Sequence, residues 1–102
     1  MRIDFLRSGG FAGLKLRLSL DVNTLPEEQA QVIRRLMDGA NFLTIDEMLP
    51  GAPNVRDEYQ YQITVITENV QHTVQAAESS MPEPLRPFVD ELTRLAREQR
   101  RR

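Results

Sequence analysis

The sequence contains no cysteine and only one histidine among its 102 residues. The missing cysteines exclude a disulfide framework, a thiolate zinc site and a cysteine nucleophile, and they favour a reducing compartment. The histidine, His72, falls in a predicted strand, and no residues at motif spacing supply the partners that a metal site or a catalytic dyad needs. We therefore expect no bound metal and no cofactor, and we interpret His72 as a partly buried strand residue near a sheet edge.

Long apolar runs and a strong excess of one charge are also missing. No run approaches the roughly 20 apolar residues of a membrane span, and the first residues lack the apolar segment of a secretory signal. The formal net charge of -2 gives no electrostatic case for nucleic acid as a partner. The locally basic residues 94–102 are expected to form a frayed, solvated tail. With 40% apolar residues, the chain is predicted to be one soluble globular domain over residues 1–102.

Residues that often carry catalysis stand here in patterns typical of turns and loops. Ser79 and Ser80 precede a helix start without the glycine elbow of a serine hydrolase. Adjacent acids such as Asp46 and Glu47 lie in a predicted loop, where nothing holds them as an acid and base pair across a substrate. We therefore predict no catalytic residue and no enzymatic activity.

Two hairpins are predicted from apolar residues that alternate with polar ones. The first joins residues 3–7 to residues 14–22 through a glycine-rich turn, and the second joins residues 59–65 to residues 70–76 through a turn near residues 68–69. A period of two places alternate side chains on opposite faces of a strand. Each hairpin is therefore expected to bury one face.

Two amphipathic helices are predicted from a period of three to four. Thr24 is the candidate N-cap of the first helix, with Glu27 completing a capping box, and Gly39 and Asn41 supply the stop. The second helix starts in the proline-rich residues 82–87. Its apolar stripe consists of Leu85, Phe88, Val89, Leu92, Leu95 and Ala96.

The resulting order, ββαββα, predicts the fold class. We expect an α+β domain with a four-stranded antiparallel sheet and two helices packed on one face. The connection over residues 41–58 is longer than is common in a compact domain, and residues 44–49 within it can form a short helix. The predicted solvent face of the sheet carries Lys15, Arg17, Gln60, Gln62, Thr73 and Gln75.

The turn of the first hairpin, RSGGFAG, holds three of the five glycines around one aromatic ring, Phe11. It lacks the spacings of phosphate-binding loops and leads into a strand, where a phosphate site needs a helix N-terminus. Phe11, with Met48 and Leu49 in the long loop, would provide exposed apolar anchors for a partner if nothing in the domain covers them. The alternative is that all three side chains pack under the loops.

RSGGFAG, TLPEEQAQ, YQYQITV and MPEPLRPFVDEL occur in this order and lead to a resemblance. The sequence resembles the emfourin family, small protein inhibitors of protealysin and other thermolysin-like zinc metallopeptidases, up to about Leu92. The resemblance implies a cytoplasmic bacterial protein that binds the active protease one to one in a tight complex. We expect the free protein to be a monomer without nucleic-acid or membrane partners.

An inhibitor can coordinate the protease zinc or plug the substrate cleft, and plugging is the hypothesis that fits this sequence. With no cysteine and one strand histidine, thiolate or imidazole coordination is disfavoured. The glycines would let the backbone of the turn approach the protease cleft closely, and Phe11 would enter the apolar substrate pocket of the protease. The predicted protease-binding residues are Ser8, Gly9, Gly10, Phe11, Ala12, Gly13, Met48 and Leu49.

Two other functions stay open at this point. The chain can be an interaction or regulatory module that binds a partner away from any active site. It can also bind nucleic acid through the sheet and the arginine-rich end, in which case its affinity would fall steeply with salt.

Overall fold

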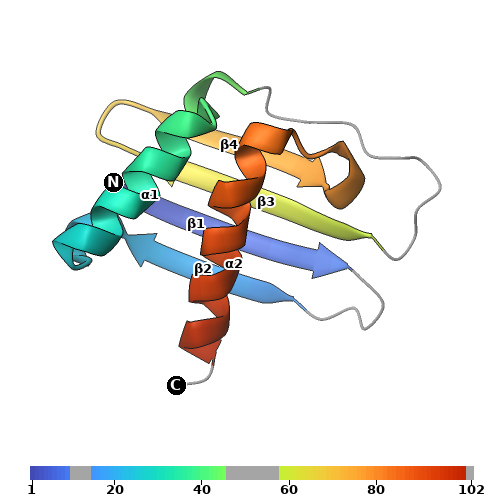
Figure 1. Ribbon diagram of the computed structural model, residues 1–102, viewed down its shortest axis with the longest axis horizontal. Helices are drawn as coiled ribbons and strands as arrows, with labels where there is room; N and C mark the ends of the chain where they lie inside the picture. The colour runs from blue at the N-terminus through green and yellow to red at the C-terminus, as the bar shows by residue number, and fades with distance from the viewer. Residues whose placement is uncertain (10–14, 46–57, 101–102) are drawn as a thin grey trace.

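Four strands form one antiparallel sheet in the computed structural model, which describes residues 1–9, 15–45 and 58–100. The sheet order is β2-β1-β3-β4, so the two hairpins meet along the central pair of β1 and β3 (Figure 1). The strands are β1 (Arg2–Gly9), β2 (Leu16–Asp21), β3 (Tyr59–Ile66) and β4 (Gln71–Ala77).

Both long helices lie on the same face of the sheet (Figure 1). They are α1 (Glu27–Gly39) and α2 (Arg86–Arg100). Short 3-10 helices connect the elements, namely η1 (Val22–Thr24), η2 (Phe42–Thr44), η3 (Glu78–Ser80) and η4 (Glu83–Leu85). The predicted α+β fold, with the order ββαββα, is confirmed.

The start of α1 differs from the prediction. Thr24 is not the N-cap, because its hydroxyl donates to the carbonyl of Asp21 over 2.8 Å inside η1, and the N-cap position is held by Pro26. The Asp21 side chain accepts from the backbone of Asn23 over 3.0 Å and so begins the 3-10 turn instead. The predicted stop is confirmed, since α1 ends at Gly39 and Asn41 adopts the left-handed conformation with φ 51°.

The end of α2 extends into the predicted basic tail. Residues 94–100, expected to be a frayed tail, are helical, whereas residues 101–102 lie outside the described residues. Leu95 and Ala96 are buried, so the apolar stripe of α2 also packs this turn against the sheet. Arg94 adds ion pairs of 2.7 Å to Glu91 and 2.7 Å to Glu98 on the outer side.

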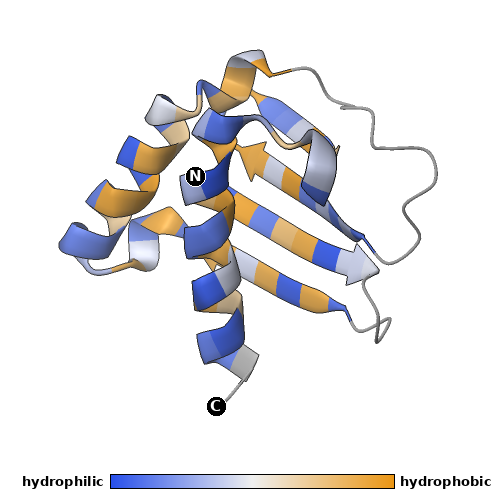
Figure 2. Cartoon of the chain, turned by 45° about the vertical axis from the view of Figure 1, so that its right-hand side comes forward, coloured by the Kyte–Doolittle hydropathy of each residue, from blue (hydrophilic) through white to orange (hydrophobic). Residues whose placement is uncertain are grey.

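Alternation along the strands builds the core. Apolar and polar residues succeed one another along most of each strand (Figure 2), and most of the apolar ones face the helices. The buried strand residues are Ile3, Phe5, Leu16, Leu18, Leu20, Tyr61, Ile63, Val65, Val74, Ala76 and Ala77. The predicted polar face carries exposed residues on β2, β3 and β4, as expected.

Phe42 joins the edge of the sheet to α2. Its ring lies 5.7 Å from that of Phe88 at 78° and 5.6 Å from that of His72 at 86°, both edge to face. His72 Nε2 lies 2.7 Å from the carbonyl oxygen of Ile45, so His72 is the partly buried residue of an edge strand that the sequence predicted. η2 ends at Thr44, where the predicted short helix would begin, and residues 46–49 lie outside the described residues.

Replacing Phe42 by leucine tests this aromatic junction. Phe42→Leu is expected to cost about 1–3 kcal/mol of unfolding free energy, because two aromatic contacts are lost while most of the apolar volume stays. Leu43→Ala is the matched control at the exposed neighbouring residue and should change stability by less than about 0.5 kcal/mol. Urea unfolding measures both, and equal losses would contradict a structural role for the aromatic contacts.

Candidate functional site

Strand pairing brings the two stems of the first predicted binding loop and the C-terminal stem of the second to one end of the sheet. Gly9, the last residue of β1, pairs with Tyr59, the first residue of β3, and Arg7 pairs with Leu16 at the start of β2. Residues 7–9, 15–16 and 58–61 therefore lie together (Figure 1), and we name them the loop-bearing end. One segment that adjoins it is 10–14 and the other is 46–57.

Two of the predicted protease-binding residues are described, and both lie at the loop-bearing end. Ser8 pairs with Gln60 and lines a hollow of about 260 Å³ with glutamine side chains of the open sheet face, while Gly9 ends the strand. The remaining predicted residues lie outside the described residues: Gly10, Phe11, Ala12, Gly13, Met48 and Leu49.

Gly9 occupies a position that accepts only glycine without strain. Its φ is +81°, in a region that L side chains rarely adopt. A Cβ built on Gly9 would lie 2.8 Å from the carbonyl oxygen of Glu58, closer than real Cβ atoms come. The glycine thus lets the stem of the first loop touch the backbone that leads into β3.

Aromatic and cationic stacking fixes the inner face of the loop-bearing end. The guanidinium carbon of Arg7 lies 4.2 Å from the centre of the Tyr59 ring, a cation–π contact. Tyr59 in turn packs against Tyr61, with ring centres 6.4 Å apart and planes at 60°, and Tyr61 lies 6.1 Å from Phe5 in the core. This cluster joins the end of β1 to the start of β3 through side chains as well as backbone.

Tyr61 and Glu78 connect the cluster to the start of α2. Tyr61 is 8% exposed, and burial raises the pKa of its hydroxyl, an effect that the neighbouring Glu78 carboxylate reinforces and Arg7 opposes. Arg86, at the start of α2, donates to the Glu78 carbonyl over 3.0 Å and lies 3.4 Å from its carboxylate. The Glu58 carboxylate accepts from the backbone of Ser79. The start of α2 is thereby fixed to the loop-bearing end.

This cluster was not predicted from the sequence. Tyr59 and Tyr61 stand two residues apart in a strand, which places both rings on one face, and this signal was present. Their contact with Arg7 depends on the pairing of β1 with β3, which are separated by about half of the chain. Local periodicity carries no information on that pairing.

Ser80 serves as a turn residue in the described structure. The Ser80 hydroxyl is engaged by the backbone of Ala77 over 3.2 Å, as expected for a turn residue. Within residues 1–9, 15–45 and 58–100, no three histidine or acidic side chains are placed to hold a metal ion. In the same ranges, no helix is long and apolar enough to cross a bilayer.

A pair of glycine substitutions tests whether the position of Gly9 requires glycine. Gly9→Ala is expected to destabilise the fold by about 1–2 kcal/mol or more, because a left-handed conformation and a close contact both oppose the new Cβ. Gly39→Ala is the control, since a Cβ there meets nothing within 4 Å and alanine favours a helix by up to about 1 kcal/mol. Chemical denaturation measures both, and a neutral Gly9→Ala variant would contradict the conformation described for Gly9.

The raised pKa of Tyr61 predicts an alkaline loss of stability. The folded state holds the phenolic proton more tightly than the unfolded state, so its stabilisation is complete below the unfolded pKa of about 10 and declines as pH rises above it. Unfolding free energies measured across this range should therefore fall above about pH 10, and Tyr61→Phe should reduce the fall. Identical pH dependence in the two proteins would contradict the burial of this hydroxyl.

Comparison with known proteins gives one match. A family model described as Emfourin matches residues 5–93, which include β2, α1, β3 and β4 completely. No curated protein and no solved structure matches the chain. The match covers most of the sheet, all residues of the loop-bearing end and the greater part of α2. The chain therefore belongs to the emfourin family, a family of metalloprotease inhibitors.

Proposed function

We propose that this protein inhibits thermolysin-like zinc metalloproteases of the protealysin type by blocking the active-site cleft in a tight one-to-one complex. The family match over residues 5–93 carries the choice of target class. The structural observation that supports cleft blocking is the pairing of Gly9 with Tyr59, which places the stem of the first loop beside the C-terminal stem of the second. Inhibition of this kind needs binding and no reacting group on the inhibitor.

A fixed stem gives the first loop an advantage over a flexible peptide. Six consecutive pairs, from Arg2 with Asp21 to Arg7 with Leu16, hold the two sides of the hairpin in register. A segment held in this way loses less conformational entropy on binding than a free peptide, so the same contacts give tighter association. In the proposal, Phe11 enters the apolar substrate pocket, and Met48 and Leu49 extend the contact.

The position of His72 supports plugging over imidazole coordination of the protease zinc. His72 is the second residue of β4, at the end of that strand remote from the loop-bearing end. Its Nε2 is engaged with the Ile45 carbonyl and its ring packs on Phe42. Reaching a zinc ion would require breaking both contacts.

Titration of the protein into an assay of a thermolysin-like protease tests the proposal. We expect activity to fall linearly to an end point near one equivalent, as tight one-to-one binding requires. Full activity at a large excess would remove that enzyme as a target. Binding without loss of activity would instead support the alternative, a regulatory module that binds away from the active site.

Phe11→Ala tests the proposed plug directly. Losing a buried phenylalanine side chain should weaken inhibition about tenfold to a hundredfold, because about 1.5–3 kcal/mol of apolar burial is removed. The matched control is Val70→Ala, an exposed apolar residue in the turn at the opposite end of the sheet, and it should inhibit like the parent. Circular dichroism must show both variants folded, and equal inhibition by all three proteins would contradict loop insertion.

A further inference from the structure

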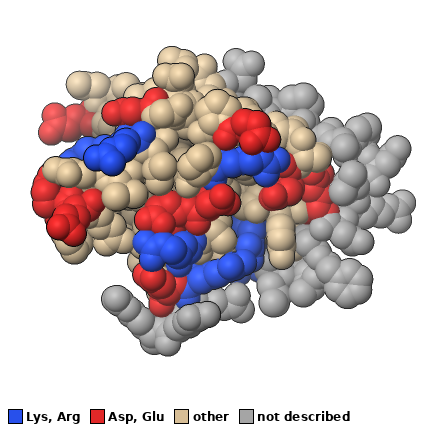
Figure 3. Space-filling view, viewed as in Figure 1, with Lys and Arg blue, Asp and Glu red and all other residues tan. Residues whose placement is uncertain are grey.

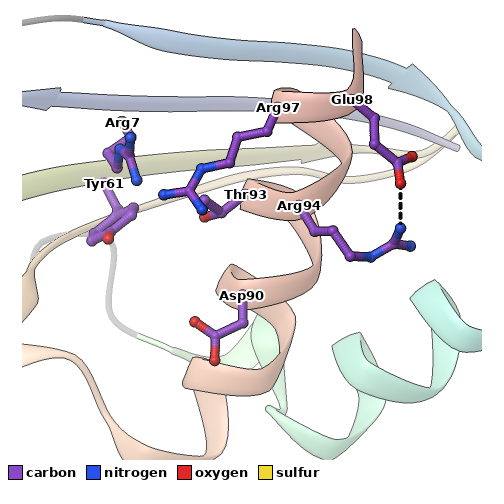
Figure 4. Close-up of a pocket in the computed structure, with 7 residues that line it drawn as sticks. All are labelled: Arg7, Tyr61, Asp90, Thr93, Arg94, Arg97 and Glu98. Atoms are coloured by element: carbon purple, nitrogen blue, oxygen red, sulfur yellow. Dashed lines mark hydrogen bonds and ion pairs between the residues drawn. The ribbon is translucent and has the colours of Figure 1, made fainter. Parts of the chain in front are cut away.

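A polar hollow of about 530 Å³ lies beside the loop-bearing end, between α2 and the inner face of the sheet (Figure 4). Cationic side chains outnumber anionic ones around it, whereas basic and acidic side chains are intermixed over the rest of the helix-bearing surface (Figure 3). It is lined by Arg7, Tyr61, Asp90, Thr93, Arg94, Arg97 and Glu98.

Part of this lining is already engaged within the fold. Arg94 donates to Glu91 over 2.7 and 2.9 Å and to Glu98 over 2.7 Å, so its charge is balanced by two acids of its own helix. The Thr93 hydroxyl donates to the carbonyl of Val89 over 2.8 Å. The charges that remain available to a ligand are those of Arg7, Arg97 and Asp90.

Arg7 and Arg97 converge on one side of the hollow. Arg97 extends from α2 toward Arg7 and Tyr61, while Arg94 points away toward Glu98 (Figure 4). Arg7 Nε is buried without a hydrogen-bond partner in the described part of the chain, and neither guanidinium forms an ion pair there. A buried donor without a partner is costly, and two cations that face each other repel.

A carboxylate placed between the two guanidinium groups would remove both costs. Its two oxygens match the planar donors of arginine, and each arginine can supply a charge-assisted hydrogen bond. Asp90 lies two turns before Arg97 on α2 and gives the other side of the hollow a negative charge (Figure 4). The hollow therefore orients a carboxylate toward the arginine side.

We propose that this hollow binds an acidic side chain of the partner protein. We favour a protein carboxylate over a free small anion because the hollow adjoins the loop-bearing end. Arg7, which lines the hollow, is two residues before Gly9 and stacks on Tyr59. In this respect the inference rests on the proposed function, since a partner held by the loops would extend over the hollow.

A direct test needs no protease. The ¹⁵N-labelled protein is titrated with a blocked tripeptide that has glutamate at its centre, with the glutamine tripeptide as the uncharged control, while the arginine Nε–H signals are followed by NMR. We expect saturable shifts at Arg7 and Arg97 with the glutamate peptide alone. Shifts no larger than those of Arg35, an exposed arginine of α1, would overturn the proposal. Equal affinity for acetate would also overturn it, because a free small anion would then suffice.

Two substitutions, one that removes a positive charge and one that removes a negative charge, distinguish a site that selects carboxylates from a nonspecific effect of mutation. Arg97→Gln should weaken binding of the glutamate peptide about tenfold or more, because a hydrogen bond to a charged group is lost. Asp90→Asn should tighten it, because a repelling charge is removed. The matched control Arg35→Gln should leave it unchanged, and a loss in Arg35→Gln equal to that in Arg97→Gln would overturn the assignment.

The same variants in the protease titration distinguish this proposal from the proposed function. If the parent inhibits and Arg97→Gln inhibits more weakly at low salt than Arg35→Gln does, both proposals are supported. If all variants inhibit equally, inhibition stands and the hollow is not part of the contact. If the parent binds the glutamate peptide but inhibits no thermolysin-like protease, the proposed function fails while the carboxylate site remains.

Discussion

The antiparallel pairing of β1 with β3 is the constraint on which the rest of the structure depends. Each hairpin alone exposes an apolar face, and only their union along this central pair makes one sheet wide enough for α1 and α2 to cover. The register of that pairing sets Gly9 opposite Tyr59. A shift by one residue would turn every side chain of a strand to the other face and would end the pairing of Gly9 with Tyr59.

The helix α2 links this constraint to the proposed functional surface. Phe88 and Leu92 seal the inner face of the sheet, and Arg86 fixes the start of the helix beside Tyr61 through Glu78. The same helix then presents Arg97 to the hollow beside Arg7. One packing arrangement thus stabilises the core, holds the loop-bearing end and places the basic side chains next to it.

Much of this architecture could be predicted from the sequence, because its signals are local. Alternation identified the strands and their buried faces, and Gly39 with Asn41 marked the end of α1. The Thr24 cap was wrong because Asp21 competes for the same turn. The contact of Arg7 with Tyr59 could not be predicted, since it depends on long-range register.

We propose that the loop-bearing end is the surface that meets the protease. Hydroxyl-radical footprinting of the free and protease-bound protein tests it, because exposed side chains mark both ends of the sheet. Tyr59 is 37% exposed at the loop-bearing end, and Val70 is 43% exposed in the turn at the opposite end. We expect Tyr59 to lose its labelling in the complex while Val70 keeps it. Protection of Val70 with continued labelling of Tyr59 would contradict it.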